Sequence, residues 1–328
     1  MVRCFWVCGI ALALSAGGAP ASAAPRTGDA PTAAARSAPE RFHLKRHPTV
    51  ALTFDDLPAG GGLHEGETRT GIATRLADEL RANHLEGSYG FVNATGVADD
   101  ADLQGALRVW LAAGMNIGNH TWSHPSLTDV SAGDFLHNIA LDEPVLREYA
   151  GDRDWHWFRF PYLEEGDTLA KRDAVRGWLE AHGYRTAEVT LNFNDDDWDD
   201  PYGRCLEKHD EAGIAWLKQS YLKNAAEFIR LGREEEDIAF GHEIPNVLLL
   251  HETSFTTLML PDLLKLLRSD GFRFASLSKV ERNPAYALDP NAALPGGGSL
   301  PNEFLNSRHL KYPPFKPEPV DRLNGLCN

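Results

Sequence analysis

The chain alternates short apolar runs with longer amphipathic stretches, and this alternation restricts its fold more than any other feature. Seven short runs have the composition of buried strands, and six longer stretches show the spacing of helices with one apolar face. The expected strands are residues 50–54, 88–92, 116–118, 157–160, 186–190, 247–250 and 273–276, and the expected helices are residues 71–83, 102–113, 132–149, 168–182, 212–231 and 258–269. Such alternation predicts an α/β fold of βα units around a mostly parallel sheet, which is either a barrel or a doubly wound sheet.

The two ends of the chain do not follow this pattern. Residues 1–23 combine Arg3, an apolar run and a small-residue cleavage site, which predicts a cleaved signal peptide and a secreted or periplasmic protein. The alternative is an uncleaved membrane anchor, although the apolar run of roughly 15 residues is shorter than the ~20 that a spanning helix needs. Residues 24–41 have the composition of a flexible linker, and residues 284–328 form a Pro- and Gly-rich tail expected to lie over the surface of the domain.

Charge and cysteine content narrow the possible partners. A formal net charge of -15 argues against a nucleic acid or an anionic membrane surface as partner, and no stretch outside the signal peptide could span a membrane. The oligomeric state is not indicated by the sequence. Signal cleavage would remove Cys4 and Cys8, so we expect Cys205 and Cys327 to form a disulfide that pins the tail to the domain.

Polar residues follow several of the expected strands, at the sheet edge where ligands gather in α/β folds. Asp55 and Asp56 end the first strand, and His120 and His124 follow the third at a spacing that lets two imidazoles meet on one ion from a helical turn. Each pair also has an ordinary explanation. The acids could cap the next helix, and the histidines could be surface or core residues.

Two later strands add further candidates to the same edge. Arg159 lies in the fourth expected strand, where it could hold a carboxylate, and His251 directly follows the sixth. A buried ion pair and a core histidine are the ordinary alternatives. Together with the aspartates and the histidine pair, these residues predict one polar site at the ends of four strands.

Five segments in this order, "TFDD", "HTWSH", "RFPY", "NFNDDDW" and "LLLH", resemble the motifs of polysaccharide deacetylases of the NodB-homology type, carbohydrate esterase family 4. The resemblance covers about residues 49–277 and implies that residues 42–283 form the catalytic domain. It implies an irregular (β/α)7-type barrel and a bound divalent metal, most often zinc.

Residue roles are carried over from the same resemblance. It implies that Asp56, His120 and His124 bind the metal, that Asp55 is the catalytic base and His251 the catalytic acid, and that Arg159 orients Asp55. The matching motifs also make Pro161, Tyr162 and Trp198 candidate substrate-binding residues, although aromatic residues at strand edges also occur in cores.

The chain departs from the family pattern in two places. Family members commonly have Asp four residues before the Trp of the acidic motif, as partner of the catalytic His, whereas this chain has Asn194; Asp195, Asp196 or Asp197 could take its place. Residues 199–246 are longer than one crossover requires, which predicts an extra helical insertion near the site.

The expected function is metal-dependent removal of N-acetyl groups from an amino-sugar polysaccharide or oligosaccharide, such as peptidoglycan or a chitin-like chain. The metal centre implied by the resemblance would equally serve an O-deacetylase of a polysaccharide such as xylan or a deformylase of an amino sugar. A non-catalytic carbohydrate-binding protein is a further alternative. The sequence has no HExxH segment and no Gly-x-Ser-x-Gly segment, so zincin and serine hydrolase chemistry are not supported.

Overall fold

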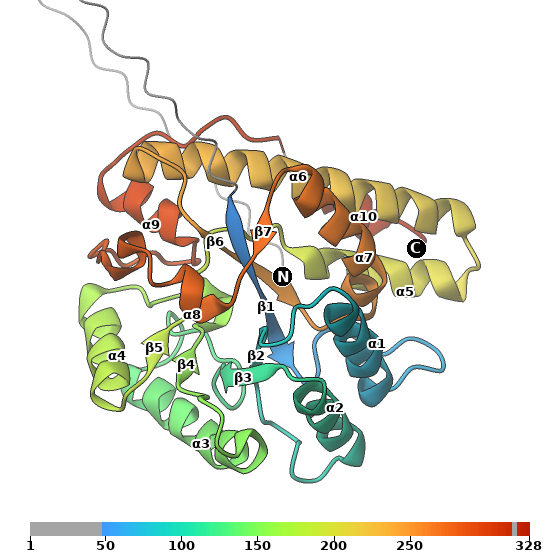
Figure 1. Ribbon diagram of the computed structural model, residues 1–328, viewed down its shortest axis with the longest axis horizontal. Coiled ribbons are helices and arrows are strands. Elements are labelled where there is room, and N and C mark those ends of the chain that lie inside the picture. The colour runs from blue at the N-terminus through green and yellow to red at the C-terminus, as the bar shows by residue number, and fades with distance from the viewer. Residues whose placement is uncertain (1–47, 317–319) are drawn as a thin grey trace, which may run out of the picture. The chain divides into compact units, whose positions relative to one another are not determined.

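The computed structural model describes residues 48–316 and 320–328; the predicted signal peptide and linker lie outside the described residues. Seven strands form one sheet, in which every strand pair is parallel (Figure 1). The strands are β1 (Thr49–Leu57), β2 (Tyr89–Val92), β3 (Asn116–Asn119), β4 (Trp157–Phe158), β5 (Arg185–Thr186), β6 (Asn246–His251) and β7 (Arg273–Phe274). Each of them overlaps an expected strand. Short, nearly continuous apolar runs are typical of parallel strands, which are buried on both faces of the sheet.

The sheet curls toward closure. Its order is β5-β4-β3-β2-β1-β6, and β7 pairs with the first residues of β1. The segment after β5 leaves β4 and reaches the far side of β6, where Leu191 bridges Leu248 and accepts a hydrogen bond from the Leu249 N–H at 3.0 Å. The expected strand at 186–190 is therefore short, because its residues pass from one neighbour to the other. This arrangement confirms the α/β class and the irregular (β/α)7-type barrel.

Helices follow the strands and surround the sheet in Figure 1. They are α1 (Arg69–Ala82), α2 (Ala101–Ala112), α3 (Ala132–Ala150), α4 (Leu169–Ala181), α7 (Ser254–Ser269) and the short α8 (Leu277–Val280). Thr68, Ser131 and Thr253 each accept a hydrogen bond from the first turn of the helix that follows. Side-chain oxygens at this position satisfy backbone N–H groups that the helix leaves free, which fixes where each helix begins.

The predicted insertion is helical. It contains α5 (Asp199–Glu207) and the 30-residue α6 (Glu211–Phe240), which is longer than the expected helix at 212–231. Asp210 caps the start of α6 and Gly241, in a left-handed conformation, ends it. Among the described residues, no helix is both long and apolar enough to cross a membrane.

The expectation that the C-terminal tail only lies over the surface of the domain is wrong, because part of the tail is buried. It forms the 3-10 turn η3 (Pro284–Ala287), α9 (Leu300–Ser307) and α10 (Val320–Gly325). Leu300, Phe304 and Leu305 are buried in a small apolar cluster, and Phe304 packs edge-on against Phe240 at the end of α6. The apolar face of α9 is therefore part of the domain.

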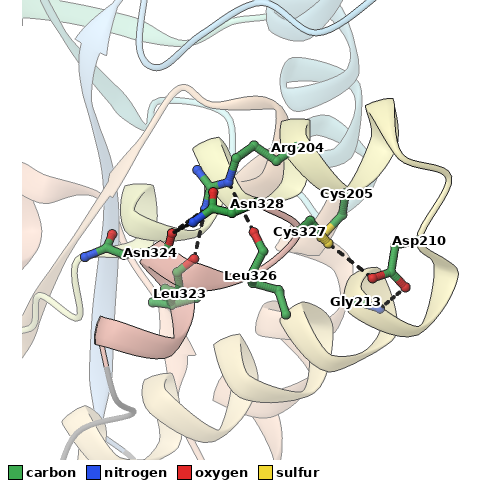
Figure 2. The surroundings of a disulfide bond; sticks show 9 residues. All are labelled: Arg204, Cys205, Asp210, Gly213, Leu323, Asn324, Leu326, Cys327 and Asn328. Carbon is green, nitrogen blue, oxygen red and sulfur yellow. Dashed lines mark hydrogen bonds between the residues drawn. A yellow bond between two sulfur atoms is a disulfide. The ribbon is translucent and has the colours of Figure 1, made fainter.

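The predicted disulfide between Cys205 and Cys327 is present, and Figure 2 shows its surroundings. It joins α5 to the end of the chain, 122 residues later. The Arg204 guanidinium donates hydrogen bonds to the carbonyl oxygens of Leu326 at 3.1 Å and Leu323 at 2.9 Å. The last residues are thus held to the insertion by a covalent bond and by hydrogen bonds.

Candidate active site

A cleft of about 360 Å³ opens at the carboxyl ends of the central strands. Its lining residues come from β1 and β6, from the loops after β3, β4 and β5, and from the tail: Asp55, Asp56, His120, His124, Tyr162, Leu163, Glu164, Asn192, Asn194, Asp196, Asp197, Leu249, His251 and Gly296. No lysine or arginine of the described residues lines it. Among the lining residues, histidines are therefore the side chains that can carry a positive charge opposite the carboxylates.

A buried arginine, Arg159, holds the carboxylate of Asp55 in place. Its carboxylate is 2% exposed and accepts hydrogen bonds from Arg159 Nη1 at 3.1 and 3.2 Å. Arg159 is itself held by the carbonyl oxygen of Ala187 and the hydroxyl of Thr53. Burial raises the pKa of Asp55 to about 6, against the opposing positive charge of Arg159.

A register slip brings both aspartates into the same cleft. The ladder between β1 and β2 shifts between Phe54 and Leu57, and Asp56 has a φ of 66°, in the left-handed region. Side chains of successive residues in a regular strand point to opposite faces, but this irregularity turns Asp56 so that it joins Asp55 in lining the cleft. Asp55 also pairs with His251 across β1 and β6.

The two histidines lie on a loop, so the expectation that a helical turn carries them is wrong. His120 directly follows β3, and the loop reaches His124 through Thr121, with φ angles of 66° for Thr121 and 54° for His124. The imidazole rings nevertheless meet, with centroids 4.7 Å apart. Two left-handed residues replace the helical geometry that the spacing suggested.

The donor atoms of these side chains fit a divalent ion. Asp56 Oδ1 lies 3.6 Å from His120 Nε2 and 3.4 Å from His124 Nε2, and the three ligand atoms all lie within 4.8 Å of one another. His120 Nδ1 is 2.8 Å from the Arg159 carbonyl oxygen, so Nδ1 carries the proton and Nε2 presents its lone pair. Burial and the neighbouring histidine lower the pKa of His120 well below its ordinary value, which favours the neutral form that binds metals.

His251 is paired with Asp195, one residue after the position that the family motif led us to expect. Asp195 Oδ1 lies 2.8 Å from His251 Nδ1, while Oδ2 accepts hydrogen bonds from the His251 N–H at 3.0 Å and the Thr256 hydroxyl at 2.5 Å. Burial lowers the pKa of His251, but the charge and hydrogen bond of Asp195 outweigh it and leave the pKa well above its ordinary value. Asn194 lines the cleft itself, with a φ of 52°.

A second group of potential ligands, Asp195, Asp196 and His251, also lies within metal-binding distance. Asp195 is completely buried and both its oxygens already accept hydrogen bonds, one of them at the histidine nitrogen that faces it. A cation would have to displace the His251 proton from this pair. The group at Asp56 is therefore the better metal site.

The three candidate substrate-binding residues have different positions. Tyr162 lines the cleft, is 59% exposed, and has its ring 4.4 Å from that of His124. Pro161 is buried and does not line the cleft; it begins the turn η1 (Pro161–Leu163) that presents Tyr162. Trp198 is 2% exposed and its Nε1 donates to Ser220 Oγ at 2.9 Å, so it is a core residue and its expected contact with substrate is corrected.

Some lining residues were not among the candidates from sequence. Asn192 and Leu249 line the cleft from within the segments NFNDDDW and LLLH, to which the resemblance assigned a role only at other positions. Gly296 lines it from the tail. The run of three glycines at residues 296–298 was a signal for a chain segment that approaches another backbone closely.

Comparisons with known proteins agree with these motifs. Residues 44–187 match a family model described as polysaccharide deacetylase. A chitin deacetylase from Arthroderma benhamiae is 30% identical over 124 residues, 38% of this chain and 30% of that protein. A chitin deacetylase from Pestalotiopsis sp is 28% identical over 149 residues, 45% of each chain.

The likeness to solved structures is weaker. The chitin deacetylase from the fungal pathogen Colletotrichum lindemuthianum has 21% sequence identity and a TM-score of 0.48, with 71% of this chain and 86% of that chain covered. The matches span between 30% and 45% of the length of the curated relatives. The substrates named for those relatives therefore belong to proteins of which only a part is matched.

Proposed function

Because the chain belongs to the polysaccharide deacetylase family through residues 44–187, we propose that it is a metal-dependent hydrolase that removes N-acetyl groups from an amino-sugar polysaccharide or oligosaccharide. One observation carries the proposal. A single cleft holds a carboxylate fixed by Arg159, a three-residue donor set for a divalent ion, and a histidine paired with a buried aspartate.

Asp56, His120 and His124 would hold the ion, and the mixture of one carboxylate and two imidazoles suits zinc. When bound, such an ion supplies Lewis-acid chemistry, because it polarises a carbonyl group and lowers the pKa of water. His120 is kept in the binding tautomer by the Arg159 carbonyl oxygen. Arg159 therefore supports the base through its guanidinium and a ligand through its backbone.

Asp55 is placed to act as the base. It is held by two hydrogen bonds from one guanidinium nitrogen, so its position does not depend on the substrate. The carboxylate takes one proton from the water that attacks the acyl carbon, and the remaining hydroxyl becomes part of the acetate product.

His251 is placed to act as the acid. Its Nδ1–H donates to Asp195, which stabilises the imidazolium and leaves Nε2–H free to be given away. An amine is a poor leaving group unless it is protonated, so His251 delivers a proton to the amide nitrogen as the carbon–nitrogen bond breaks. The products are acetate and a free amino sugar. Asp55 has gained one proton and His251 has lost one, so transfer of a proton from Asp55 to His251 by way of solvent returns both groups to their starting states.

The test is release of small acids by purified protein. Acetate and formate would be measured with N-acetylated chitin oligosaccharides, peptidoglycan and acetylxylan, before and after metal removal and after adding back zinc. We expect acetate from an N-acetylated glycan, its loss on chelation and its recovery with zinc. Acetate from acetylxylan alone would show an O-deacetylase, formate a deformylase, and glycan binding without any release a carbohydrate-binding protein.

We further propose that the protein works outside the cytoplasm. The disulfide between Cys205 and Cys327 supports this location, because such bonds persist in oxidising compartments. Fractionation of cells that express the full chain, with detection of the mature N-terminus by sequencing, tests the location. Full-length protein in the cytoplasm would contradict it.

A further inference from the structure

A second hollow of about 240 Å³ adjoins the cleft. Both hollows are lined by Tyr162, Leu163, Asn192, Asn194 and Gly296, so they are two parts of one groove. The far wall of the second hollow comes from α6, from the glycine-rich loop before α9 and from α9 itself. Those elements lie outside residues 44–187, the part of the chain that matches the family model.

In the wall shared by the two hollows, the backbone of the tail lies very close to that of the turn after β4. Gly297 has a φ of 70°, and a Cβ at this position would lie 2.1 Å from the Tyr162 carbonyl oxygen. Tyr162 and Leu163 also have positive φ angles, 59° and 56°. This close approach sets the backbone of Tyr162 at the junction of the hollows, where its exposed ring offers an aromatic face that can stack on a sugar.

A buried carboxyl group lines the second hollow without a cation. Glu235 on α6 is 6% exposed, and among the residues described it makes no ion pair with a lysine or arginine. Its neighbour Glu234, by contrast, pairs with Arg230 at 2.5 Å. Burial raises the pKa of Glu235 to about 7, because the Asn302 side chain only partly offsets the loss of water.

Two further features restrict what the hollow can hold. The Asn302 side chain is the polar neighbour of Glu235, but its buried amide nitrogen makes no hydrogen bond of ordinary geometry among the described residues. No lysine or arginine of the described chain lines either hollow, and Glu235 is the charged side chain that lines the second one, so an anionic group there would have no cation to pair with. A cationic ligand with hydroxyl groups would satisfy both Glu235 and Asn302.

We propose that this second hollow is a subsite for a sugar unit with a free amine, next to the unit whose acetyl group occupies the cleft. This inference rests on the proposed deacetylase function and adds the form of the substrate, a partly deacetylated amino-sugar chain. The ammonium group pairs with Glu235, the Asn302 amide donates to a hydroxyl group, and Tyr162 stacks on the ring. Each deacetylated unit then favours reaction at its neighbour.

Binding of glycan probes tests the subsite separately from turnover if every protein also carries Asp55→Asn, which should block acetate release and keep the metal. Isothermal titration at neutral pH would compare this parent protein with its Glu235→Gln variant and the matched control Glu234→Gln, with a glucosamine tetramer and an N-acetylglucosamine tetramer as probes. We expect Glu235→Gln alone to weaken binding of the glucosamine tetramer roughly tenfold, because one charge-assisted contact is lost, and to leave the acetylated tetramer unchanged. Equal weakening in both variants, or none, would overturn the inference.

Kinetics supply a second readout that also separates this inference from the proposed function. For wild type, kcat/KM for acetate release should be higher on a tetramer with one free amine than on the fully acetylated tetramer, and Glu235→Gln should remove that preference. No preference in wild type overturns the inference even if the variant does not fold. Absence of acetate release with a retained effect of Glu235→Gln on binding would reject the proposed function and support the subsite.

Discussion

His251 Nδ1 lies 2.8 Å from Asp195 Oδ1, and the second oxygen of the same carboxylate holds the backbone N–H of His251. One buried side chain therefore fixes both the ring and the strand end that carries it. This arrangement keeps the histidine protonated at the cleft, because a carboxylate without exposure to water stabilises an adjacent positive charge strongly.

Asp195→Asn should lower kcat by roughly 10²- to 10⁴-fold, the usual contribution of a positioned acid, with a smaller effect on KM. The amide keeps the shape of the side chain but not the charge that stabilises the imidazolium. Steady-state acetate release measures both constants. Asp196→Asn is the control, since its carboxylate is 3.5 Å from His251 and half exposed, and an equal loss in this control would contradict the pairing.

Much of this site follows from the sequence, for a physical reason. The apolar runs fix where parallel strands lie, and the residues that follow them, such as Asp55 and His251, must share one edge of the sheet. The left-handed backbone of Asp56 and His124 could not be predicted, because residues other than glycine rarely adopt it and no glycine marks either position. Likewise, only the fold shows that Asp195 meets His251 and that Trp198 packs in the core.

Glu252, directly after His251, provides a test of pH-dependent stability. Its carboxyl group is 3% exposed, and neither oxygen has a hydrogen-bond partner among the described residues. Burial raises its pKa to about 8, although the charge of Arg69 opposes this shift. In the folded protein the Glu252 carboxyl group therefore stays protonated up to about pH 8, whereas in the unfolded chain it loses its proton near its ordinary pKa of 4.5. The free energy of unfolding therefore falls as pH rises from about 5 to about 8.

Glu252→Gln should reduce that fall, because glutamine resembles the protonated acid and cannot ionise. The free energy of unfolding should be similar to wild type at pH 5 and higher by as much as roughly a few kcal/mol at pH 8. Urea unfolding at a series of pH values measures it. Glu148→Gln, at an exposed position on α3, is the control, and a variant with the wild-type pH slope would show that Glu252 is not the group responsible.

Removal of the disulfide should destabilise the domain. The bond joins residues 122 positions apart, and closing so long a loop in the unfolded chain is worth roughly 4 to 5 kcal/mol in the chain-entropy estimate. A Cys205→Ala, Cys327→Ala double variant should unfold at lower urea concentration than oxidised wild type. Thiol titration of the unfolded, unreduced wild-type protein checks the premise, since two free thiols would mean that the bond does not form.

The paired aspartates should separate metal binding from proton transfer. Asp55→Asn should lower acetate release by roughly 10²- to 10⁴-fold but keep the metal, because Asp56, His120 and His124 remain. It should also lower the melting temperature, since the buried Arg159 loses its counter-charge. Asp56→Asn should instead weaken metal binding by more than the roughly 10- to 100-fold lost when a residue that only supports a ligand is changed.

Metal content per folded protein and acetate release on both variants decide between these roles. Loss of metal in Asp55→Asn, with metal and activity retained in Asp56→Asn, would reverse the assignment. Full activity in both would place the catalytic site elsewhere. The geometry favours Asp56 as the metal ligand and Asp55 as the base, because the Asp55 carboxylate is already occupied by two hydrogen bonds from Arg159, whereas Asp56 Oδ1 faces the Nε2 atoms of both histidines at 3.4 and 3.6 Å.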